Sequence, residues 1–249
     1  MPYDDILVGM DDTQLIQEEE YTFPYHHIPQ IEPFSQTRSL WWGYEYAAYL
    51  AYILSELSSR SFDSLIDIGC GDGRLLAELA STSHAKLHGT DFSDKALSFA
   101  RAFSPLAVSF SKNPPEEKFD IFTAIEVFEH IHPDDADAFL ATCAESVKAN
   151  GIGIISVPTT NIPLNPKHYR HFTENTFREA LEKHFIVERI VHLNGQTLVA
   201  KIVQRLLANR FFILNWQPAK DFLYHWYIRT SLFGTPTNAI RVLAVVRKQ

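Results

Sequence analysis

The chain has 249 residues, of which 46% are hydrophobic and 21% charged, a balance typical of a single globular domain with a large core. A net charge of −8 disfavours a general nucleic-acid-binding protein. Cys70 and Cys143 lie far apart, so neither a disulfide framework nor a thiolate metal site is indicated. No signal-peptide pattern and no apolar run of membrane-spanning length are visible, so the expected location is the cytoplasm.

Charge is unevenly distributed along the chain. Residues 1–37 hold eight acids and no Lys or Arg, whereas residues 196–249 hold eight Lys and Arg against one acid, Asp221. Aromatic residues and prolines punctuate the acidic segment, which predicts an irregular arm or cover over 1–40 and a folded domain over 41–249. The basic segment leaves a phosphate-bearing partner open, and the two ends could equally pair with each other.

Helix and strand patterns alternate after the arm. A helix is expected over 41–57, where Tyr46, Leu50, Ile53 and Leu57 recur at helical spacing. The alternation that follows predicts βαβ units and a doubly wound α/β sheet. The expected strands are 64–68, 86–90, 106–110, 119–125, 151–157, 185–192 and 239–247, and the expected helices are 73–80, 93–101, 134–149 and 173–184.

The first of these strands runs directly into a glycine-rich turn. Residues 64–73 read SLIDIGCGDG, with Gly69, Gly71 and Gly73 at alternate positions before a helical pattern. Glycines at such a turn allow positive φ and let a ligand approach the backbone closely. Asp91, at the end of the next strand, is placed to accept hydrogen bonds from a ribose diol.

The spacing of the glycines decides between kinds of ligand. A dinucleotide site has Gly-x-Gly-x-x-Gly. Counted from Gly69, the third glycine of that motif would fall at position 74, which is Arg74. No Gly-Lys-Ser/Thr follows, which excludes a phosphate-binding P-loop. Asp67, two residues before the turn, would repel a pyrophosphate and attract a cationic ligand such as a sulfonium with its amino group. A tight turn that binds no ligand is the structural alternative.

Asp67-Ile-Gly-Cys-Gly-Asp-Gly and Thr90-Asp91-Phe92 resemble the first two motifs of the class I S-adenosylmethionine-dependent methyltransferases. The resemblance implies a Rossmann-like, doubly wound sheet of seven strands, mostly parallel, with the last strand antiparallel. It covers roughly 45–193 and the final strand. Ser111-Lys-Asn113 stands where the family usually has an acid that contacts adenine. The resemblance implies S-adenosyl-L-methionine as cofactor, bound by Asp67, Gly69, Cys70, Gly71, Gly73, Asp91, Phe92, Ile125 and Glu126.

A second group of polar residues follows the fourth predicted strand. Glu126, Glu129 and His130 share one side of a helical turn, at the carboxyl edge where α/β sheets bind ligands. His168 lies further on, five residues before Thr173, which is expected to cap the next helix. Two carboxylates with one or two imidazoles are a plausible ligand set for Mg, Mn or Zn.

Glu-x-x-Glu-His resembles the metal motif of the Hen1 family, which methylates 2′-hydroxyls of small RNAs, and of ubiquinone-pathway O-methyltransferases. That resemblance implies Glu126, Glu129, His130 and His168 as metal ligands. The Asp-His-x-Phe-Glu-Trp wording of the Hen1 family is absent. The chain instead reads His168-Tyr-Arg-His-Phe-Thr173, as do many bacterial small-molecule and glycan methyltransferases. A metal-free site with His130 or His168 as catalytic base and a purely structural role both stay open.

Residues 196–236 form an insertion of mostly helical character before the last strand. Apolar residues recur in rows at helical spacing in its first part, where Lys201 and Arg205 share a face. Many aromatic residues follow. Three interpretations stay open: a lid over a sugar or other aromatic-stacking acceptor, a basic amphipathic surface on a membrane, or ordinary helix packing, including a homodimer interface.

These patterns predict an enzyme that methylates a hydroxyl of a small molecule or glycan. An alcohol is a weak nucleophile at neutral pH, so a His base or a divalent metal must help to remove its proton. A Hen1-like enzyme acting on RNA 3′ ends is a second hypothesis, disfavoured by the acidic composition. A non-catalytic, methyltransferase-like binding protein is the third.

Overall fold

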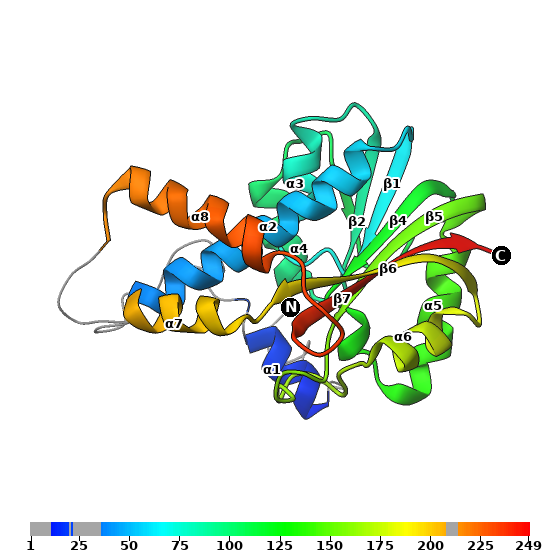
Figure 1. Cartoon of the computed structure of the whole chain (residues 1–249). Coiled ribbons are helices and arrows are strands. Elements are labelled where there is room, and N and C mark those ends of the chain that lie inside the picture. The colour runs from blue at the N-terminus through cyan, green and yellow to red at the C-terminus, as the bar shows by residue number, and fades with distance from the viewer. Residues whose placement is uncertain (1–10, 20, 22–35, 208–213) are drawn as a thin grey trace.

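The computed structural model describes residues 11–19, 21, 36–207 and 214–249, with side chains in the second helix from residue 43 onward. Figure 1 shows a central twisted sheet with helices on both faces. The seven strands of the sheet lie in the order β3-β2-β1-β4-β5-β7-β6. They are β1 (Ser64–Ile68), β2 (Lys86–Thr90), β3 (Ser109–Ser111), β4 (Phe119–Ile125), β5 (Val147–Pro158), β6 (Phe185–Gly195) and β7 (Ala239–Lys248).

The strand directions confirm the predicted doubly wound sheet. β1 pairs in parallel with β2 and β4, and β7 is antiparallel to both of its neighbours, β5 and β6. The chain winds outward from β1 to β3 and then returns to β4 on the other side of β1. The carboxyl ends of β1 and β4 therefore flank the switch point, where sheets of this kind bind ligands.

The sheet divides the core into two layers, and helices cover each of them. Figure 1 shows α2 (Gln36–Ser58), α3 (Arg74–Ala80) and α4 (Asp94–Phe103) on one face, and α5 (Ala136–Glu145) and α6 (Glu174–Leu181) on the other. Along β7, Leu243 and Val245 pack into the first layer, whereas Val242 and Val246 pack into the second. Successive side chains of a strand point to opposite faces, so a strand covered on both faces is apolar at nearly every position.

Several predicted boundaries differ from the structure. β5 begins at Val147 rather than at residue 151, and α6 ends at Leu181 rather than at residue 184. The helix expected over 134–149 ends at Glu145, because Val147 already pairs with Phe119 in the sheet and Asn150 adopts a φ of 61°. The strand expected over 106–110 is β3, which begins only at Ser109. A turn precedes it, closed by a hydrogen bond of 3.0 Å from the Val108 amide to the Pro105 carbonyl.

Helices α7 (Leu198–Leu207) and α8 (Gln217–Ser231) form the predicted insertion and extend beyond the sheet beside α2 (Figure 1). Both contact α2. Of the predicted arm over 1–40, residues 1–10, 20 and 22–35 lie outside the described residues, and 36–40 begin α2. Residues 12–19 form a short helix, α1 (Asp12–Glu19). Within the described residues, no helix has both the length and the apolarity needed to cross a membrane.

Candidate active site

The glycine turn after β1 is held against the end of β2. The amides of Gly69 and Cys70 both donate to the Thr90 carbonyl, at 2.7 and 2.8 Å. The Gly71 amide donates to one carboxylate oxygen of Asp91 at 2.9 Å, and the Ser93 amide donates to the other at the same distance. These bonds fix the Asp91 carboxylate beside the turn and still leave lone pairs on both oxygens for a ligand.

The three glycines adopt left-handed conformations, with φ of 76°, 54° and 78°, but for different reasons. A Cβ on Gly69 would overlap the Val127 side chain, and a Cβ on Gly73 would lie 3.0 Å from Ala100 of α4. Among the described residues, a Cβ on Gly71 would meet only the Tyr21 hydroxyl, at 3.6 Å. Gly69 and Gly73 therefore permit close packing within the protein, whereas Gly71 keeps space open above the turn.

Two buried carboxylates lie at this edge. Burial raises the pKa of Asp67 to about 7, although the Thr123 hydroxyl donates to it at 2.6 Å, and the nearby Asp91 adds to the rise. Burial likewise raises the pKa of Asp91 to about 6, against the two backbone amides that lower it. Both groups would be stabilised in their charged form by a cationic ligand or by hydroxyl donors.

Two cavities that share several lining residues border the turn. The larger, of about 400 Å³, reaches from the turn across β4 to the loop after β5. The smaller, of about 200 Å³, lies beside Asp91 and the exposed ring of Phe92. Of the predicted site residues, Gly73 lines neither cavity, and Ser111 and Asn113 are likewise absent from both linings. The larger cavity is lined by the predicted residues Asp67, Gly69, Cys70, Gly71, Ile125, Glu126, Glu129, His130 and His168.

Helix α1 contributes to the walls of both cavities. Gln17 and Tyr21 line both of them. The Tyr169 hydroxyl donates to the Asp11 carboxylate, and the Lys95 ammonium donates to the Glu18 carbonyl at 3.4 Å. These bonds connect the described part of the N-terminal segment to two different sides of the site.

Glu126 belongs to a closed ring of side-chain contacts rather than to the other predicted metal ligands. It has a φ of 57° and accepts from Arg241 Nε at 3.0 Å and from the Ser156 hydroxyl at 3.3 Å. The Arg241 guanidinium lies 4.9 Å from the ring centre of Tyr49, and the Tyr49 hydroxyl hydrogen-bonds Ser156. The ring joins α2, β5 and β7 under the cavity and occupies the Glu126 carboxylate.

Glu129, His130 and His168 do converge. Their potential ligand atoms lie within 4.8 Å of one another. Glu129 and His130 come from the short 3-10 turn η2 (Phe128–His130), and His168 comes from the loop before α6. Glu129 is 1% exposed, and its Oε2 has no hydrogen-bond partner among the described residues. Burial, reinforced by the neighbouring Glu126, raises the pKa of Glu129 well above its ordinary value.

Hydrogen bonds behind the two imidazoles assign their tautomers. His130 Nδ1 lies 2.9 Å from the Lys167 carbonyl and, because a carbonyl only accepts, this nitrogen carries the hydrogen. In the same way, His171 Nδ1 donates to the Ile162 carbonyl at 3.3 Å. The Nε2 of neutral His171 then accepts from His168 Nδ1 at 2.8 Å. Both His130 and His168 are thereby left with an Nε2 lone pair, and His130 Nε2 lies 3.8 Å from the Glu129 carboxylate.

The environment also keeps His168 neutral. Burial is the main cause that lowers its pKa to about 3, and the imidazoles of His130 and His171 and the Lys167 ammonium act in the same direction. A neutral imidazole oriented by a hydrogen bond through its other nitrogen is the usual arrangement of a metal-ligating or proton-accepting histidine.

Sequence reasoning missed three residues that shape the site. Arg241 and Tyr49 complete the ring around Glu126, and His171 orients His168. A lone arginine in the apolar run AIRVLAVV was the available signal for Arg241, since an unpaired charge is not buried in a strand. Nothing in the sequence distinguished Tyr49 from the other tyrosines of α2.

Comparisons with known proteins agree with this architecture. Residues 66–152 match the family model described as "Methyltransferase domain". The ubiquinone biosynthesis O-methyltransferase of Alkalilimnicola ehrlichii is 32% identical over 165 residues, covering 57% of this chain and 63% of that protein. The protein of the same description from Nitrosomonas europaea is 30% identical over 159 residues, covering 56% and 65%. The chain thus spans less than two thirds of the length of these relatives.

Among solved structures, the N-methyltransferase NodS of Bradyrhizobium japonicum in complex with S-adenosyl-L-homocysteine superposes with a TM-score of 0.61. The identity is 15%, and the match covers 96% of this chain and 99% of the other. The strand order and the glycine turn at the switch point define an α/β protein of the Rossmann-like class. Within that class, the chain is similar to S-adenosylmethionine-dependent methyltransferases, and its residues 66–152 match a methyltransferase domain.

Proposed function

We propose that the protein transfers a methyl group from S-adenosyl-L-methionine to a hydroxyl of a small molecule. The observation that carries this proposal is the continuity of the site. The cavities run from the Gly71 and Asp91 pair to the cluster of Glu129, His130 and His168. A cofactor bound over the turn would have its reactive end near groups that can accept a proton. The relatives named O-methyltransferases support a hydroxyl as the acceptor.

The residues at the turn fit the cofactor. The lone pairs left on the Asp91 carboxylate suit a ribose diol, and Phe92, 45% exposed, offers an apolar face to a flat base. Asp67, 3% exposed, supplies negative charge near the turn for a cationic ligand. S-adenosylmethionine supplies an electrophilic methyl on a sulfonium. Gln17 and Tyr21 of the N-terminal cover help to exclude water while the nucleophile is aligned.

The far end of the larger cavity is where we place the acceptor. His168 lines this cavity together with Ile162 and Asn165, whose backbone carbonyls accept hydrogen bonds from His171 and His168 respectively. A space of about 400 Å³, part of which the cofactor would fill, suits a small aromatic or sugar-sized acceptor. A glycan unit is the alternative acceptor within the same site. The Nε2 lone pair of His130 or His168 can take the hydroxyl proton.

As the alternative to a histidine base, we propose that Glu129, His130 and His168 hold a divalent cation, Zn, Mn or Mg, in which case the Nε2 lone pairs bind the cation and do not accept the proton. One carboxylate and two imidazoles are the donor set of many catalytic zinc sites, and the unpartnered, buried Oε2 of Glu129 suggests a missing positive charge. A cation there would lower the pKa of an acceptor hydroxyl. Glu126 is not among the proposed ligands, because Arg241 and Ser156 occupy its carboxylate.

A matched series of acceptors tests the proposed reaction. Catechol, 2-aminophenol and 1,2-phenylenediamine differ only in hydroxyl and amine groups, and formation of S-adenosylhomocysteine is followed by mass spectrometry. Turnover is expected with the hydroxyl-bearing compounds and not with the diamine. His168→Gln should lower kcat by about a hundredfold, as loss of a proton acceptor does. Turnover confined to the diamine would contradict O-methylation.

A further inference from the structure

The inner sides of helices α7 and α8 pack against the rest of the protein. Ala200 of α7 and Tyr227 of α8 are buried, and the Tyr44 hydroxyl of α2 donates to the Lys220 carbonyl at 2.9 Å. Val203 and Leu207 pack against the same layer of the core. None of the described residues of 196–236 lines either cavity of the active site, so the outer sides of these helices serve something other than these two cavities.

The outer face of α7 is apolar. Leu198, Ile202 and Leu206 recur every four residues and share one side of the helix with Val199. Their exposed fractions are 75%, 51%, 71% and 58% respectively. Single exposed apolar side chains are common, but four adjacent ones on a helix whose opposite side is already packed mark an interaction surface. We call these four residues the outer face of α7.

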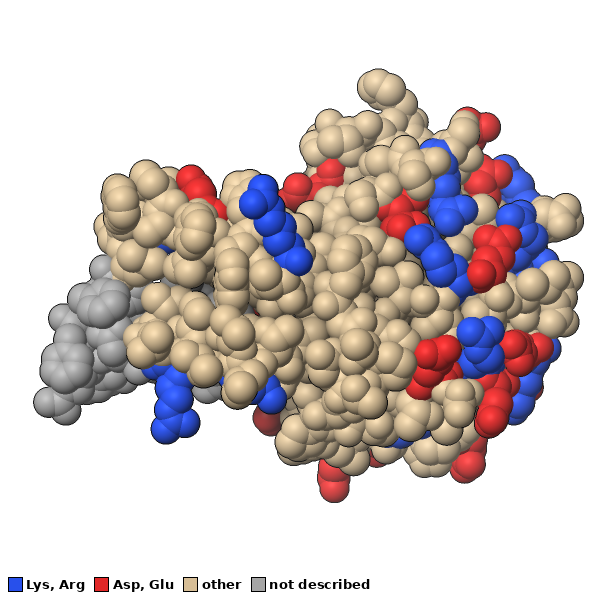
Figure 2. Space-filling model, in the orientation of Figure 1, with Lys and Arg blue, Asp and Glu red and all other residues tan. Residues whose placement is uncertain are grey.

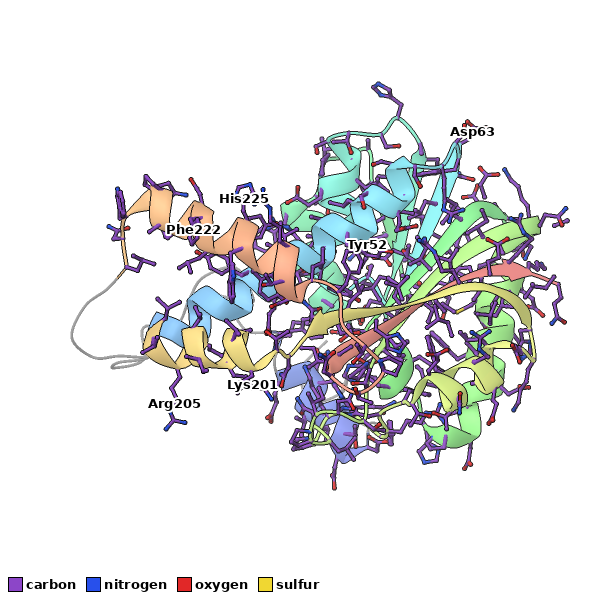
Figure 3. All side chains as sticks on the ribbon, in the orientation of Figure 1. Tyr52, Asp63, Lys201, Arg205, Phe222 and His225 are labelled. Carbon is purple, nitrogen blue, oxygen red and sulfur yellow. The ribbon has the colours of Figure 1, made fainter. Side chains whose placement is uncertain are left out.

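Basic residues border this face. Lys201 and Arg205 lie one turn apart on α7, and Figure 3 shows both side chains pointing away from the body of the protein. Helix α7 contains no acidic residue. Figure 2 shows mostly uncharged side chains over this arm, whereas acidic and basic residues are mixed over the opposite side of the molecule.

We propose that the outer face of α7 docks on the surface of an anionic lipid bilayer, with the helix lying in the plane of the interface. An apolar helix face with Lys and Arg at its border and no acid is the pattern of interfacial helices. This inference does not depend on the proposed reaction.

A second copy of the chain fits this face less well. Ten residues of helix are about 15 Å long and about 10 Å wide, so this face covers about 150 Å², far short of the roughly 800 Å² that each partner of a stable dimer buries. A two-fold contact through α7 would also set Lys201 and Arg205 against the same residues of the other copy. Anionic headgroups, in contrast, offset those charges.

Vesicle sedimentation tests the proposal with the full-length protein. The vesicles contain either phosphatidylcholine alone or equal parts of phosphatidylcholine and phosphatidylglycerol. We expect binding to the anionic vesicles, weakened by salt. The double substitution Ile202→Asp with Leu206→Asp should lower that binding by about tenfold or more. Lys201→Gln with Arg205→Gln should lower it by a similar factor.

Leu106→Asp is the matched control, because Leu106 is a fully exposed leucine in the loop after α4, away from α7. It should bind vesicles like the unaltered protein, and thermal unfolding shows that each variant is folded. Absence of binding to anionic vesicles, or equal binding by the Ile202/Leu206 variant, would overturn the proposal. A dimer in light scattering that this variant dissociates, without vesicle binding, would assign the face to self-association instead.

Discussion

At the scale of single residues, Glu126 and Glu129 are two carboxylates three positions apart with opposite surroundings. Glu126 is paired with Arg241, whereas Glu129 is buried with an unpartnered oxygen. The same chemical change at the two positions should therefore have different effects.

Glu129→Gln should abolish binding of Zn or Mn by calorimetry, because it removes the only carboxylate of the cluster. It should leave the free energy of unfolding of the metal-free protein unchanged or higher, since a carboxyl with a raised pKa is removed. Glu126→Gln should retain metal binding and lower the free energy of unfolding by about 2 kcal/mol, because Arg241 loses its counter-charge. Equal loss of metal binding in both variants would show that Glu126 is also a ligand.

Cofactor affinity should depend on pH through Asp67 and Asp91. Their pKa values are raised to about 7 and about 6, and each must be ionised to attract a cation or to accept from a ribose diol with both oxygens. Affinity for S-adenosylmethionine should therefore rise with pH through this range. Asp67→Asn should remove the upper part of the rise in a calorimetric pH series. An affinity that falls with increasing pH would contradict these roles.

The residues of the site differ in how far sequence could predict them. The turn glycines and Asp91 lie close together in the sequence, so their spacing was sufficient to predict that they meet at the end of β1. Which carboxylate joins the histidines was not predictable, because Arg241 reaches Glu126 from a strand 115 residues away. His171 lay within the motif, but its role depends on the loop that brings Ile162 to it.

At the scale of elements, the turn between β1 and α3 has no room for a methyl group at Gly73. Gly73 precedes α3 with a φ of 78°, and a Cβ there would lie 2.9 Å from Ser104 and 3.0 Å from Ala100. Gly73→Ala should lower the free energy of unfolding by about 1–3 kcal/mol.

Gly43→Ala is the control for this substitution in urea unfolding. Gly43 lies within α2, and a Cβ there would meet no atom of the described residues within 4 Å. Because alanine favours a helix interior more than glycine, Gly43→Ala should raise the free energy of unfolding by about 0.5–1 kcal/mol. Equal effects of the two substitutions would contradict the packing role of Gly73.

The order and type of the elements followed from alternating helix and strand patterns, but their ends were less predictable. β5 begins at Val147, within a sequence that reads as the end of a helix, because pairing with Phe119 outweighs local preference there. The insertion was expected to be mostly helical, yet its packing on α2 was not predictable from its amphipathic pattern, which is apolar on two sides of α7.

At the scale of the whole molecule, the buried carboxyls at the switch point should lower the free energy of unfolding of the ligand-free protein at neutral pH. Both Asp67 and Asp91 have folded-state pKa values above the roughly 4 of an unfolded chain. The folded state therefore binds protons more tightly, and this contribution to stability is lost as pH rises from about 4 to about 7.

Because Asp67 and Asp91 lose their protons, the ligand-free protein should become less stable to urea as pH rises from about 4 to about 7. Asp67→Asn should flatten the dependence, because the amide does not ionise. Bound S-adenosylmethionine should restore stability at neutral pH by mass action. A dependence on pH that Asp67→Asn leaves unaltered would show that other groups dominate.

Binding of S-adenosylmethionine at the glycine turn is the claim on which the proposed reaction depends, and isothermal titration calorimetry measures it directly. We expect the unaltered protein to bind one equivalent, and Asp91→Asn to bind at least tenfold more weakly, as expected for loss of a charge-assisted hydrogen bond. Asp94→Asn is the control, because Asp94 lies three residues away and pairs with Lys112 at the surface. No binding, or equal affinity in Asp91→Asn and the unaltered protein, would contradict the assignment of the site.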